Sequence, residues 1–556
     1  MKYLLKPFIF AGVMLIGFAA CKKGGETPTP PPPPAKLRLI NAALDNSVGN
    51  TFTNTSLTPV LRFNFSEKVD KSSAASATAL ANAVGVAVPF TIAWERGDST
   101  MVMQPNAALT GLNRYTALVS NALKSAAGGA LAEAGSINLI TRIDSTAKFP
   151  TMSDEALLTL VQQQTFKYFW DFGHPVSGLA RERNTSGDLV TSGGSGFGIM
   201  SMVTGVHRGF VTRTQALQRI QTMVTFLKDK AQKFKGAFPH WLNGNTGIVI
   251  PFSANDNGAD LVETSLLSMG LITARQYFND GGAAETQLRS DINSILDGIE
   301  WNWFRRGNEQ VLYWHWSPDK GWAMNLKIQG WNECLITYVL AASSKNYSIP
   351  DTVYQKGFAR DGAMKNGKTF YNNKLPLGSD LGGPLFLSHY TFLGINPNGL
   401  SDQYANYWEQ NLAHSKINYE YCKANPLGRW GYSDKSWGLT ASDIPGGYTA
   451  SSPTNDVGVI APTAAISAMP YTPAESMAAL KFFYYTMGDK IWKEYGFVDA
   501  FKLTDLWFAS SFLAIDQGPQ IIMIENYRSG LLWNLFSSAP EVKAALKKLG
   551  FTAPYL

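Results

Sequence analysis

The alternation of apolar and polar positions divides the chain into two regions of different character. Between about residue 36 and residue 142, short runs of alternating or β-compatible residues are bounded by turn-forming residues, as expected for β-strands. Residues 60–65 and 99–103 are the clearest of these runs. Because such runs recur about every ten residues, this region is predicted to form a small β-sandwich.

Beyond about Ser145 the apolar residues recur at helical spacing instead. Residues 154–172 are amphipathic and follow Ser153, whose hydroxyl can cap the first turn of a helix. Loops of roughly 10 to 40 residues rich in Gly, Pro and Trp separate the helices, and loops this long in a compact domain are usually functional. The other predicted helices span residues 215–230, 259–278, 284–301, 330–343, 403–422, 474–487 and 519–537.

These helices show no fixed period, which argues against a linear helical repeat. An α/α toroid, in which an inner ring of helices lines a pocket covered by loops at one end, is the favoured alternative. The predicted fold class is therefore a multidomain chain with a small N-terminal β-sandwich and a large all-α toroid. The glycine-rich residues 193–198 lack the spacing of a phosphate loop or a nucleophile elbow and are expected to form a close-approach turn beside the pocket.

The N-terminus has the features of an exported and anchored protein. Two lysines precede a short apolar run, residues 8–20, which is too short to span a bilayer and is typical of a secretory signal. Two alanines directly before Cys21 resemble a bacterial lipobox. Residues 1–20 are therefore predicted to be a signal peptide and Cys21 the acylated first residue of the mature protein. An ordinary signal followed by an incidental cysteine is the alternative.

A proline-rich stretch at residues 27–35 follows this signal. Such a stretch is extended and acts as a semi-rigid spacer. Residues 21–36 are thus predicted to be a lipidated tether that holds a soluble body at a membrane. This predicts a cell-envelope location, in the periplasm or at the outer membrane.

Composition narrows the classes of function further. Charged residues make up only 16% of the chain, and the net charge of +6 is spread without a basic run, so nucleic acid is not an expected partner. Only Cys334 and Cys422 remain beside Cys21, too few for a disulfide framework. The six His show no metal-ligand spacing, so no metal and no cofactor are expected. A monomer is expected.

Tryptophan is concentrated in the helical region, which holds 14 of the 15. An indole ring can stack on the apolar face of a sugar, and its N–H can serve a hydroxyl group. Packing in the core is the alternative for each individual residue. The Trp residues expected to line a substrate site are Trp241, Trp314, Trp316, Trp322 and Trp331.

Three acids lie close together before an apolar run. Asp256, Asp260 and Glu263 stand at positions i, i+4 and i+7, which would share one face of a helix beginning there. Like charges at these spacings destabilise an isolated helix, so the placement favours an active site in which neighbouring carboxyls have separated pKa values. Acidic residues at a helix N-terminus, stabilised by the helix dipole, are the alternative.

A fourth acid, Glu333, opens a strongly apolar predicted helix. Burial there would raise its pKa, as a general acid requires near neutral pH. A capping glutamate in the first helical turn is the alternative. Glu525 and Arg528 stand at i and i+3 beside another apolar run, which is typical of an internal ion pair and also compatible with substrate contact.

Several of these segments together resemble a bacterial family. The helical region is similar, from about residue 153 to residue 549, to the putative glucoamylase domain, which includes glycoside hydrolase family 144 with its endo-β-1,2-glucanases and sophorose-releasing enzymes. The N-terminal region, with its Phe-Ser-Glu-Lys-Val-Asp motif at residues 65–70, resembles bacterial Ig-like modules. The matching motifs lie at residues 191–210, 238–247, 260–264, 330–333, 383–390 and 524–533.

The resemblance implies an (α/α)6 toroid that hydrolyses β-1,2-glucan by an inverting, carboxylate-based mechanism, endo-acting or sophorose-releasing. The family's acidic pocket falls on Asp256, Asp260, Glu263 and Glu333. Glu333 is expected to be the proton donor, and one acid of the other three to activate or position water. The expected substrate-binding set also includes His240, His389, Glu525 and Arg528, which lie in matching motifs.

The expected organisation is thus an Ig-like spacer at residues 37–143 and a catalytic domain at residues 150–556, with a β-glucan as substrate. Two alternatives stay open. One is a hydrolase or lyase of the same toroid that acts on another polysaccharide. The other is a non-catalytic, surface glycan-binding lipoprotein.

Overall fold

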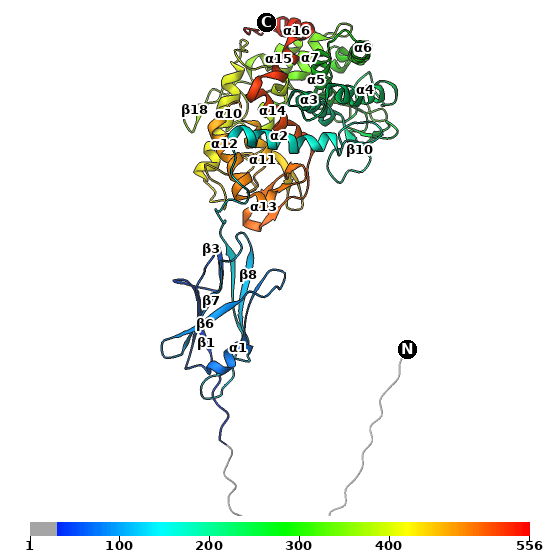
Figure 1. Ribbon diagram of the computed structural model, residues 1–556. Helices are drawn as coiled ribbons and strands as arrows, with labels where there is room; N and C mark the ends of the chain where they lie inside the picture. Colours follow the sequence, from blue (N-terminus) through cyan, green and yellow to red (C-terminus); the bar gives the residue numbers. More distant parts are fainter. Residues whose placement is uncertain (1–30) are drawn as a thin grey trace, which may run out of the picture. The chain divides into compact units, whose positions relative to one another are not determined.

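The computed structural model describes residues 31–556, which divide into two compact units with a boundary between Arg142 and Ile143. One unit is built of strands and the other mainly of helices (Figure 1). The predicted signal peptide, residues 1–20, and Cys21 lie outside the described residues. Within residues 31–556, no helix combines the length and the apolar character needed to cross a membrane.

The N-terminal unit is a β-sandwich. One sheet has the order β2-β1-β4-β7-β6 and is antiparallel throughout, whereas the other has the order β3-β9-β8-β5, with β3 parallel to β9. A short helix, α1 (Ala74–Ala77), precedes β5. The strands are β1 (Leu39–Leu44), β2 (Ser47–Val48), β3 (Thr51–Thr55), β4 (Leu61–Phe65), β5 (Thr78–Asn82), β6 (Phe90–Glu95), β7 (Thr100–Pro105), β8 (Arg114–Val119) and β9 (Gly135–Thr141).

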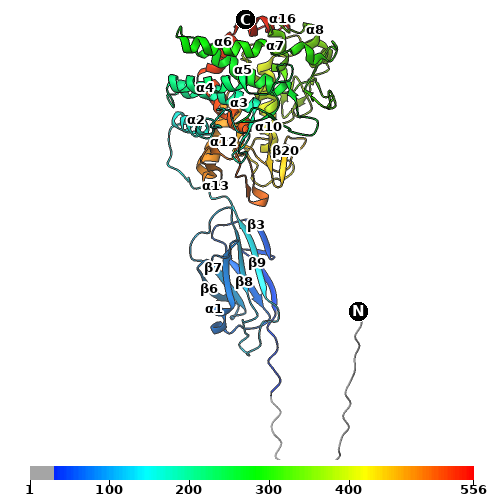
Figure 2. The same ribbon diagram turned by 90° about the vertical axis from the view of Figure 1, so that its right-hand side faces the viewer.

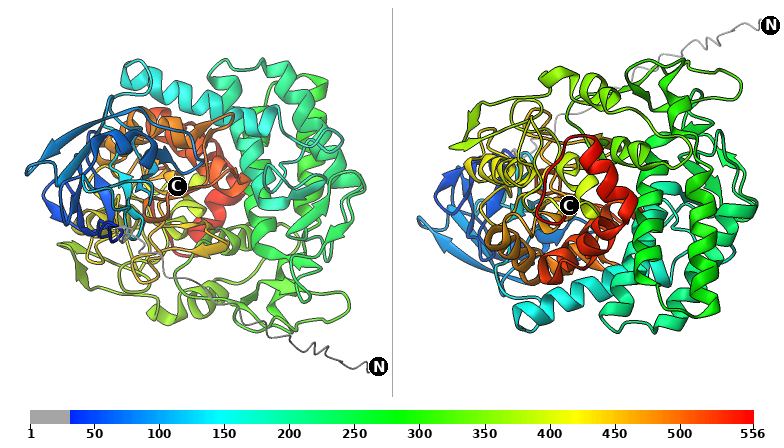
Figure 3. Two further views of the ribbon diagram at one scale, coloured as in Figure 1. Left: turned by 90° about the horizontal axis from the view of Figure 1, so that it is seen from below. Right: turned by 90° about the horizontal axis from the view of Figure 1, so that it is seen from above.

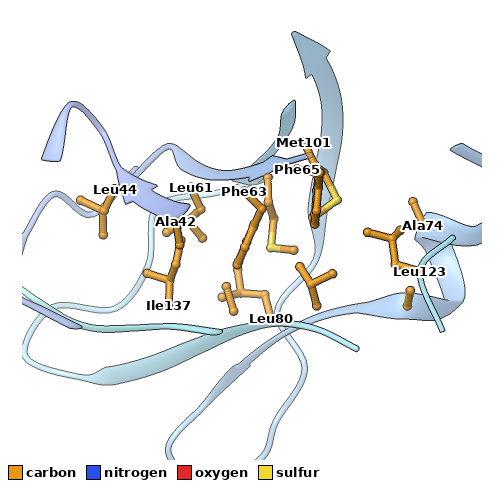
Figure 4. Close-up of a cluster of buried hydrophobic side chains, with 14 of the residues drawn as sticks. Ala42, Leu44, Leu61, Phe63, Phe65, Ala74, Leu80, Met101, Leu123 and Ile137 are labelled. Carbon is orange, nitrogen blue, oxygen red and sulfur yellow. The ribbon is translucent and has the colours of Figure 1, made fainter. Parts of the chain in front are cut away.

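Alternating side chains of β4 build the core of this sandwich. Leu61, Phe63 and Phe65 are buried, and the two residues between them are partly exposed. Figure 4 shows these three side chains in one cluster with Leu80 of β5 and Ile137 of β9, so they fill the space between the sheets. The period of two seen in the sequence therefore reflects one buried face of a strand.

The helical unit consists of six pairs, each an outer helix followed by an inner one. Neighbouring inner helices pack together: α11 against α14, α14 against α3, α3 against α5, and α5 against α7. The outer helices are α2 (Asp154–Trp170), α4 (Arg213–Asp229), α6 (Ala283–Asp297), α8 (Asp351–Val353) with a π-turn at Tyr354–Phe358, α10 (Tyr407–Ala424), and α12 (Pro473–Lys481) with a π-turn at Phe482–Thr486. The inner helices are α3 (Ser192–His207), α5 (Leu261–Tyr277), α7 (Leu335–Ser343), α9 (Phe386–His389) with a 3₁₀ turn at Thr391–Leu393, α11 (Pro462–Ser467) and α14 (Ala514–Ser529).

Three more helices and a set of short strands complete this unit. Figure 2 labels α2 to α7, and Figure 3 shows the helical unit from below and from above. Helix α15 packs against α5, and α16 packs against α7. The remaining helices are α13 (Gly488–Ile491), α15 (Leu531–Ser538) and α16 (Pro540–Lys548). The strands are β10 (Leu189–Thr191), β11 (Trp241–Asn243), β12 (Val249–Ile250), β13 (Ala259–Asp260), β14 (Leu312–Tyr313), β15 (His315–Trp316), β16 (Lys327–Ile328), β17 (Thr369–Phe370), β18 (Asn373–Lys374), β19 (Ala441–Ile444), β20 (Gly447–Ala450), β21 (Trp492–Lys493), β22 (Gly496–Phe497), β23 (Phe501–Lys502) and β24 (Trp507–Phe508).

Burial distinguishes the two rings of helices. The outer helix α4 buries one stripe, including Ala216, Ile220, Met223 and Leu227, at the spacing of an amphipathic helix. The inner helix α5 is buried on all sides over its first 14 residues. A helix enclosed in this way belongs to the inside of a large domain. The predicted fold class, a β-sandwich followed by an all-α toroid, is confirmed.

The glycine-rich segment predicted as a turn is instead the first part of α3. A Cβ on Gly196 would lie 2.2 Å from the carbonyl oxygen of Leu266, and a Cβ on Gly270 would lie 2.2 Å from that of Gly196. Glycine therefore lets the backbones of α3 and α5 approach closely. Glycine lowers helix propensity, but here the tertiary contact decides the structure.

Several helix boundaries also differ from the prediction. The helix expected over residues 519–537 starts earlier, at Ala514, and ends at Ser529; Gly530, with a φ of 68°, separates it from α15. Pro519 inside this helix cannot donate to the carbonyl of Ile515, and the hydroxyl of Tyr390 donates to that oxygen instead, at 3.2 Å. The helix expected from residue 330 begins only at α7, so Glu333 lies in the preceding turn.

Candidate active site

Acidic side chains gather at the N-terminal ends of the inner helices; Asp256, Asp260 and Glu263 are buried, and Glu333 is partly exposed. Asp260 directly precedes α5, and Glu333 lies two residues before α7. The backbone N–H of Gly193, the second residue of α3, donates to Oε2 of Glu263 in the first turn of α5, at 2.8 Å. The starts of α3, α5 and α7 therefore meet, and their helix dipoles favour negative charge there.

Asp260 is the anchor of this group. It is fully buried, and its Oδ1 caps α5 by accepting the N–H groups of Val262 at 3.0 Å and Glu263 at 2.9 Å. Its Oδ2 lies 3.1 Å from Nδ1 of His240 and 3.5 Å from Nε2 of His315. Burial alone would raise the pKa of Asp260, but the hydrogen bonds with the two imidazoles outweigh burial and hold the pKa below its usual range. Asp260 is therefore ionised.

Asp256 faces the same two histidines from the turn before β13. Its Oδ2 lies 3.4 Å from Nε2 of His315 and 4.0 Å from Nδ1 of His240. Its Oδ1 is buried and has no hydrogen-bond partner among the described residues. Burial and the charge of Asp260 raise the pKa of Asp256. The residue therefore offers a poorly hydrated oxygen that is free to bind a water or a substrate hydroxyl.

Glu263 is the only one of the three clustered acids that lies on a helix. The hydroxyl of Thr191 lies 3.4 Å from its Oε2, and Nε2 of His240 lies 3.9 Å from its Oε1. Burial raises the pKa of Glu263. The expectation that all three acids share a helical face is wrong, because α5 begins only at Leu261. They converge from a turn, a strand and a helix instead.

Glu333 joins these acids from a distant part of the sequence. Its pKa is raised to about 7, first by burial and then by the charges of Glu263 and Asp260. Its carbonyl oxygen accepts the hydroxyl of Thr391 at 2.6 Å, which fixes the turn before α7. The predicted convergence of Glu333 with the clustered acids is therefore present in the fold. A carboxyl with this pKa holds a proton part of the time near neutral pH, as a general acid must.

Two histidines neutralise part of this negative charge. Burial acts to lower the pKa of His240, but Glu263, Asp260 and Asp256 together raise it to about 9. The His240 ring also stacks on Phe252, with ring centres 4.3 Å apart. The prediction placed His240 at the substrate but missed His315, because nothing in the sequence shows that β15 pairs with β13 and sets His315 opposite Asp260.

The sequence-based argument that the six His are isolated does not hold in space. His240, Asp256 and Asp260 offer ligand atoms that lie within 4.8 Å of one another, a set that could hold a divalent cation. A divalent cation would bind the neutral imidazole, whereas without a cation these carboxylates favour the protonated form of His240, which then pairs with them as an imidazolium.

Comparisons with known proteins identify the family of each unit. Residues 325–540 match the family described as "Putative glucoamylase", and residues 45–141 match the bacterial Ig-like domain. The chain is 53% identical to a protein from Bacteroides uniformis whose crystal structure is described as a putative glucoamylase; the match covers 73% of this chain and 100% of that one, with a TM-score of 0.72. The chain belongs to the putative glucoamylase family. The family resemblance drawn from the sequence is confirmed for both units.

Two further relatives of this putative glucoamylase-family protein have named activities. An endo-β-1,2-glucanase from Chitinophaga pinensis, solved with sophorotriose and glucose, is 50% identical over 73% of this chain and 100% of its own, with a TM-score of 0.72. An exo-β-1,2-glucooligosaccharide sophorohydrolase (non-reducing end) of Parabacteroides distasonis is 45% identical over 428 residues, or 73% of this chain. The match spans only 59% of that relative's length.

A second pair of buried carboxyls lies at the start of α14 and was missed in the sequence. Asp516 and Asp499 are close enough to affect each other's pKa, and the backbone N–H of Asp443 donates to Oδ2 of Asp499 at 2.6 Å. Burial raises the pKa of Asp499 to about 7 and also raises that of Asp516, so the pair shares a proton. Asp516 lies in the first turn of a largely apolar helix, and an acid at that position was the available signal.

Tyr390 lies close to both groups of acids in the site. Burial raises its pKa, and the charges of Asp516, Glu333 and Glu263 add to that effect. Its hydroxyl is held by the carbonyl of Ile515 at 3.2 Å. The acids at the starts of α5, α7 and α14 therefore surround one region at one end of the inner helices.

The predicted Trp residues separate into three groups. Trp314 stacks on His315, and Trp241 meets His240 edge-on, so both border the acids. Trp331 is only 8% exposed and packs against Phe392 and Tyr407, as expected for a core residue. Trp316 and Trp322 instead contact Trp303 and form a separate cluster.

Glu525 and Arg528 lie at the opposite end of the inner helices. Glu525 is fully buried and accepts from Nε and Nη2 of Arg208, at 2.6 and 2.8 Å. Arg528 donates to Gln162 and Glu155, each at 2.7 Å. Because Arg208 ends α3 and Gly193 begins it, about 22 Å of helix separates this network from the acids. Glu525 and Arg528 therefore do not form the predicted ion pair with each other; they pair with Arg208 and Glu155 instead. Their contact with substrate stays a prediction, and their distance from the acids does not favour it.

His389 lies on the inner helix α9 and is 2% exposed. Burial, assisted by the nearby His414, lowers the pKa of His389 to about 3, so its ring is neutral. Its Nε2 has no hydrogen-bond partner among the described residues. Contact between His389 and substrate stays a prediction.

Proposed function

We propose that this protein is a glycoside hydrolase that cleaves β-1,2-glucan, within the chain or by releasing sophorose. The observation that carries the proposal is the partly buried Glu333 carboxyl, which has a pKa of about 7 in a site with other carboxyls. Glycosidic bond hydrolysis uses a proton donor together with a second carboxylate, and this site offers both. The linkage is taken from the two relatives named for β-1,2-glucan and its oligosaccharides.

In this proposal Glu333 donates its proton to the glycosidic oxygen as the bond from that oxygen to the anomeric carbon breaks. A carboxylate on the other side of the sugar removes a proton from the attacking water. An inverting reaction needs about 6.5–9.5 Å between the two carboxyls, to leave room for that water. Asp260 uses both oxygens to hold backbone N–H groups and imidazoles, so its role is to position the site.

Two candidates for the base remain among the acids. Asp256 carries the unpartnered Oδ1 and belongs to the group predicted to activate or position water. The Asp499–Asp516 pair shares a proton, which leaves one carboxylate ionised, and the charge of Asp516 acts on Tyr390 together with that of Glu333. Comparing Asp256→Asn with Asp516→Asn decides between them, since loss of the base removes most of the turnover while binding of glucan persists.

The alternative reaction, elimination by a polysaccharide lyase, is disfavoured by the charges at the site. A lyase needs basic groups that bind a uronate carboxylate. Among the described residues, Asp256, Asp260 and Glu263 form ion pairs with His240 and His315 and with no Lys or Arg. Near the Asp499–Asp516 pair, the guanidinium of Arg183 is already paired with Glu182 and Asp443. A site whose basic groups are held by its own acids suits a neutral glucan.

Incubating the purified chain with linear β-1,2-glucan tests the proposal. Reducing ends should appear, product chromatography should show sophorose or longer β-1,2-oligosaccharides, and NMR of the fresh products should show the inverted anomer. Linear β-1,3-, β-1,4- and α-1,4-glucans serve as controls and should remain intact. Glucan binding without reducing-end release would instead identify a surface glycan-binding protein, and cleavage of another glucan alone would reassign the substrate.

We further propose that the mature protein is an envelope lipoprotein acylated at Cys21 and active as a monomer. The proposal rests on the apolar run at residues 8–20, the small residues before Cys21 and the proline-rich tether. Metabolic labelling with a fatty acid should mark the native chain and should fail for Cys21→Ala. Equal labelling of both chains would reject the anchor, and size-exclusion chromatography with light scattering tests the monomer.

A further inference from the structure

A surface pocket lined by tryptophan lies beside the acid group but is separate from it. Its volume is about 460 Å³. Its aromatic lining comes from Trp303 and Trp322, whose indoles stack on each other with ring centres 4.9 Å apart at an angle of 29°. Both rings are partly exposed. The polar lining comes from Glu300, Asn302, Arg306 and Asn308.

The two-residue strand β15 separates this pocket from the acids. Successive side chains of a strand point to opposite faces. His315 points to Asp256 and Asp260. Trp316 contacts Trp303 instead, with ring centres 5.4 Å apart. The Trp303–Trp322 pocket and the acids therefore lie on opposite faces of β15. His315 faces the acids, and Trp316 faces the pocket.

The chemistry of the pocket fits an uncharged sugar. Flat apolar rings suit the C–H face of a pyranose, and the surrounding amide, guanidinium and carboxylate groups suit its hydroxyls. The charged lining groups have opposite signs and already have partners: Glu300 pairs with Lys235 at 3.5 Å, and Arg306 donates to Asn325 at 2.6 Å. An ionic ligand would have to displace these contacts, whereas a neutral glucan would not.

We propose that the Trp303–Trp322 pocket is a second glucan-binding site, which holds a distant part of the polysaccharide while the acids act elsewhere on it. The identity of the ligand as β-1,2-glucan rests on the proposed function. A site of this kind raises the affinity for long chains, because two linked contacts with one polymer bind more tightly than either alone. Short oligosaccharides cannot reach both sites and gain nothing.

The test measures binding in the Glu333→Gln background by isothermal titration calorimetry, with polymeric linear β-1,2-glucan and a short sophoro-oligosaccharide as probes. Adding Trp322→Ala should weaken polymer binding about tenfold, the loss expected for one aromatic contact. Binding of the short probe should change much less. Trp322→Phe keeps an aromatic ring and should restore most of the polymer affinity. Tyr527→Ala, which removes an exposed aromatic ring at the other end of α14, should leave both affinities unchanged.

The outcomes separate this proposal from the proposed function. Unchanged polymer affinity in Trp322→Ala, or an equal loss for polymer and short probe, overturns the second site. If Trp322→Ala unfolds, the exposed Asn302→Ala, which removes one polar lining group, replaces it under the same criteria. If the chain with Glu333 intact hydrolyses no β-1,2-glucan but Trp322→Ala still weakens polymer binding, the proposed function fails and the pocket stands.

Discussion

Glu333 and Glu525 lie at opposite ends of the inner helices, and their pKa values shift in opposite directions. At the N-terminal end, burial and neighbouring acids raise the pKa of Glu333 to about 7. At the other end, burial also acts to raise the pKa of Glu525, but hydrogen bonds from Arg208, Ser529 and Gln162 outweigh it and lower that pKa. Both glutamates come from the same kind of sequence, an acid beside an apolar run. The partners, rather than burial, decide which one is a proton donor and which one is structural.

This difference predicts how each end responds to mutation. A carboxyl without a basic partner is costly to bury as an anion, so its removal should spare the fold and harm the chemistry. A fully paired buried carboxylate contributes to stability, and loss of its partner leaves a buried charge. Each prediction below is a way to test that contrast.

The largest effect is expected from Glu333→Gln. The amide keeps the shape of the side chain but cannot donate the proton, so turnover of β-1,2-glucan should fall about 10²- to 10⁴-fold. Thermal unfolding should show that the variant is folded. Asp260→Asn should also remove activity, because it disturbs the network of His240 and His315. Full activity in both variants would reject this site.

Arg208→Ala tests the structural end. Glu525 would stay fully buried without its bidentate partner, which typically costs about 3–5 kcal/mol of stability. Denaturant unfolding of the variant measures this loss. Turnover per folded molecule should be close to that of the parent, because the network lies about 22 Å of helix away from the acids. A stable Arg208→Ala protein with lost turnover would reverse the assignment of the two ends.

The rate should also depend on pH through Glu333. A general acid must carry its proton, so kcat should fall as the pH rises through about 7, at most about tenfold for each further pH unit. The pH profile of glucan hydrolysis, measured with substrate in excess, checks this expectation. A rate that stays level from pH 6 to pH 9 would show that Glu333 is not the donor.

The sequence predicts the two rings of helices unequally, and the reason is physical. The outer helix α4 has polar and apolar faces, so its period is visible in the sequence. The inner helix α3 is buried all round and rich in glycine, so its sequence shows no period and suggests a turn. Only the contact with α5 explains those glycines, and that contact joins residues 70 positions apart, Gly196 and Leu266.

The same limit applies to the site. Asp256, Asp260, Glu263 and Glu333 stand out because acids beside apolar runs are unusual. His315 does not stand out in this way, because its role depends on the pairing of β15 with β13. Asp499 and Asp516 become a pair only when the chain brings the start of α14 beside the loop after β22.

The smallest expected effect is a pH-dependent change in stability, with opposite signs at the two ends. The folded-state pKa of Glu333 is raised from its ordinary value of 4.5 to about 7, so the stability gained by holding that proton is present below pH 4.5 and is lost as the pH rises through about 7. Glu333→Gln removes this loss, so the variant should melt on the order of 1–3 °C above the parent at pH 8 and match it at pH 4.

Glu525 has a lowered pKa, so its contribution to stability is present above its ordinary pKa and disappears as the pH falls through the folded-state pKa. Glu525→Gln should therefore destabilise the protein more at pH 8 than at pH 4. Melting curves of both variants at the two pH values measure the contrast, and a shift of the same sign in both would show that the two carboxyls share one kind of environment.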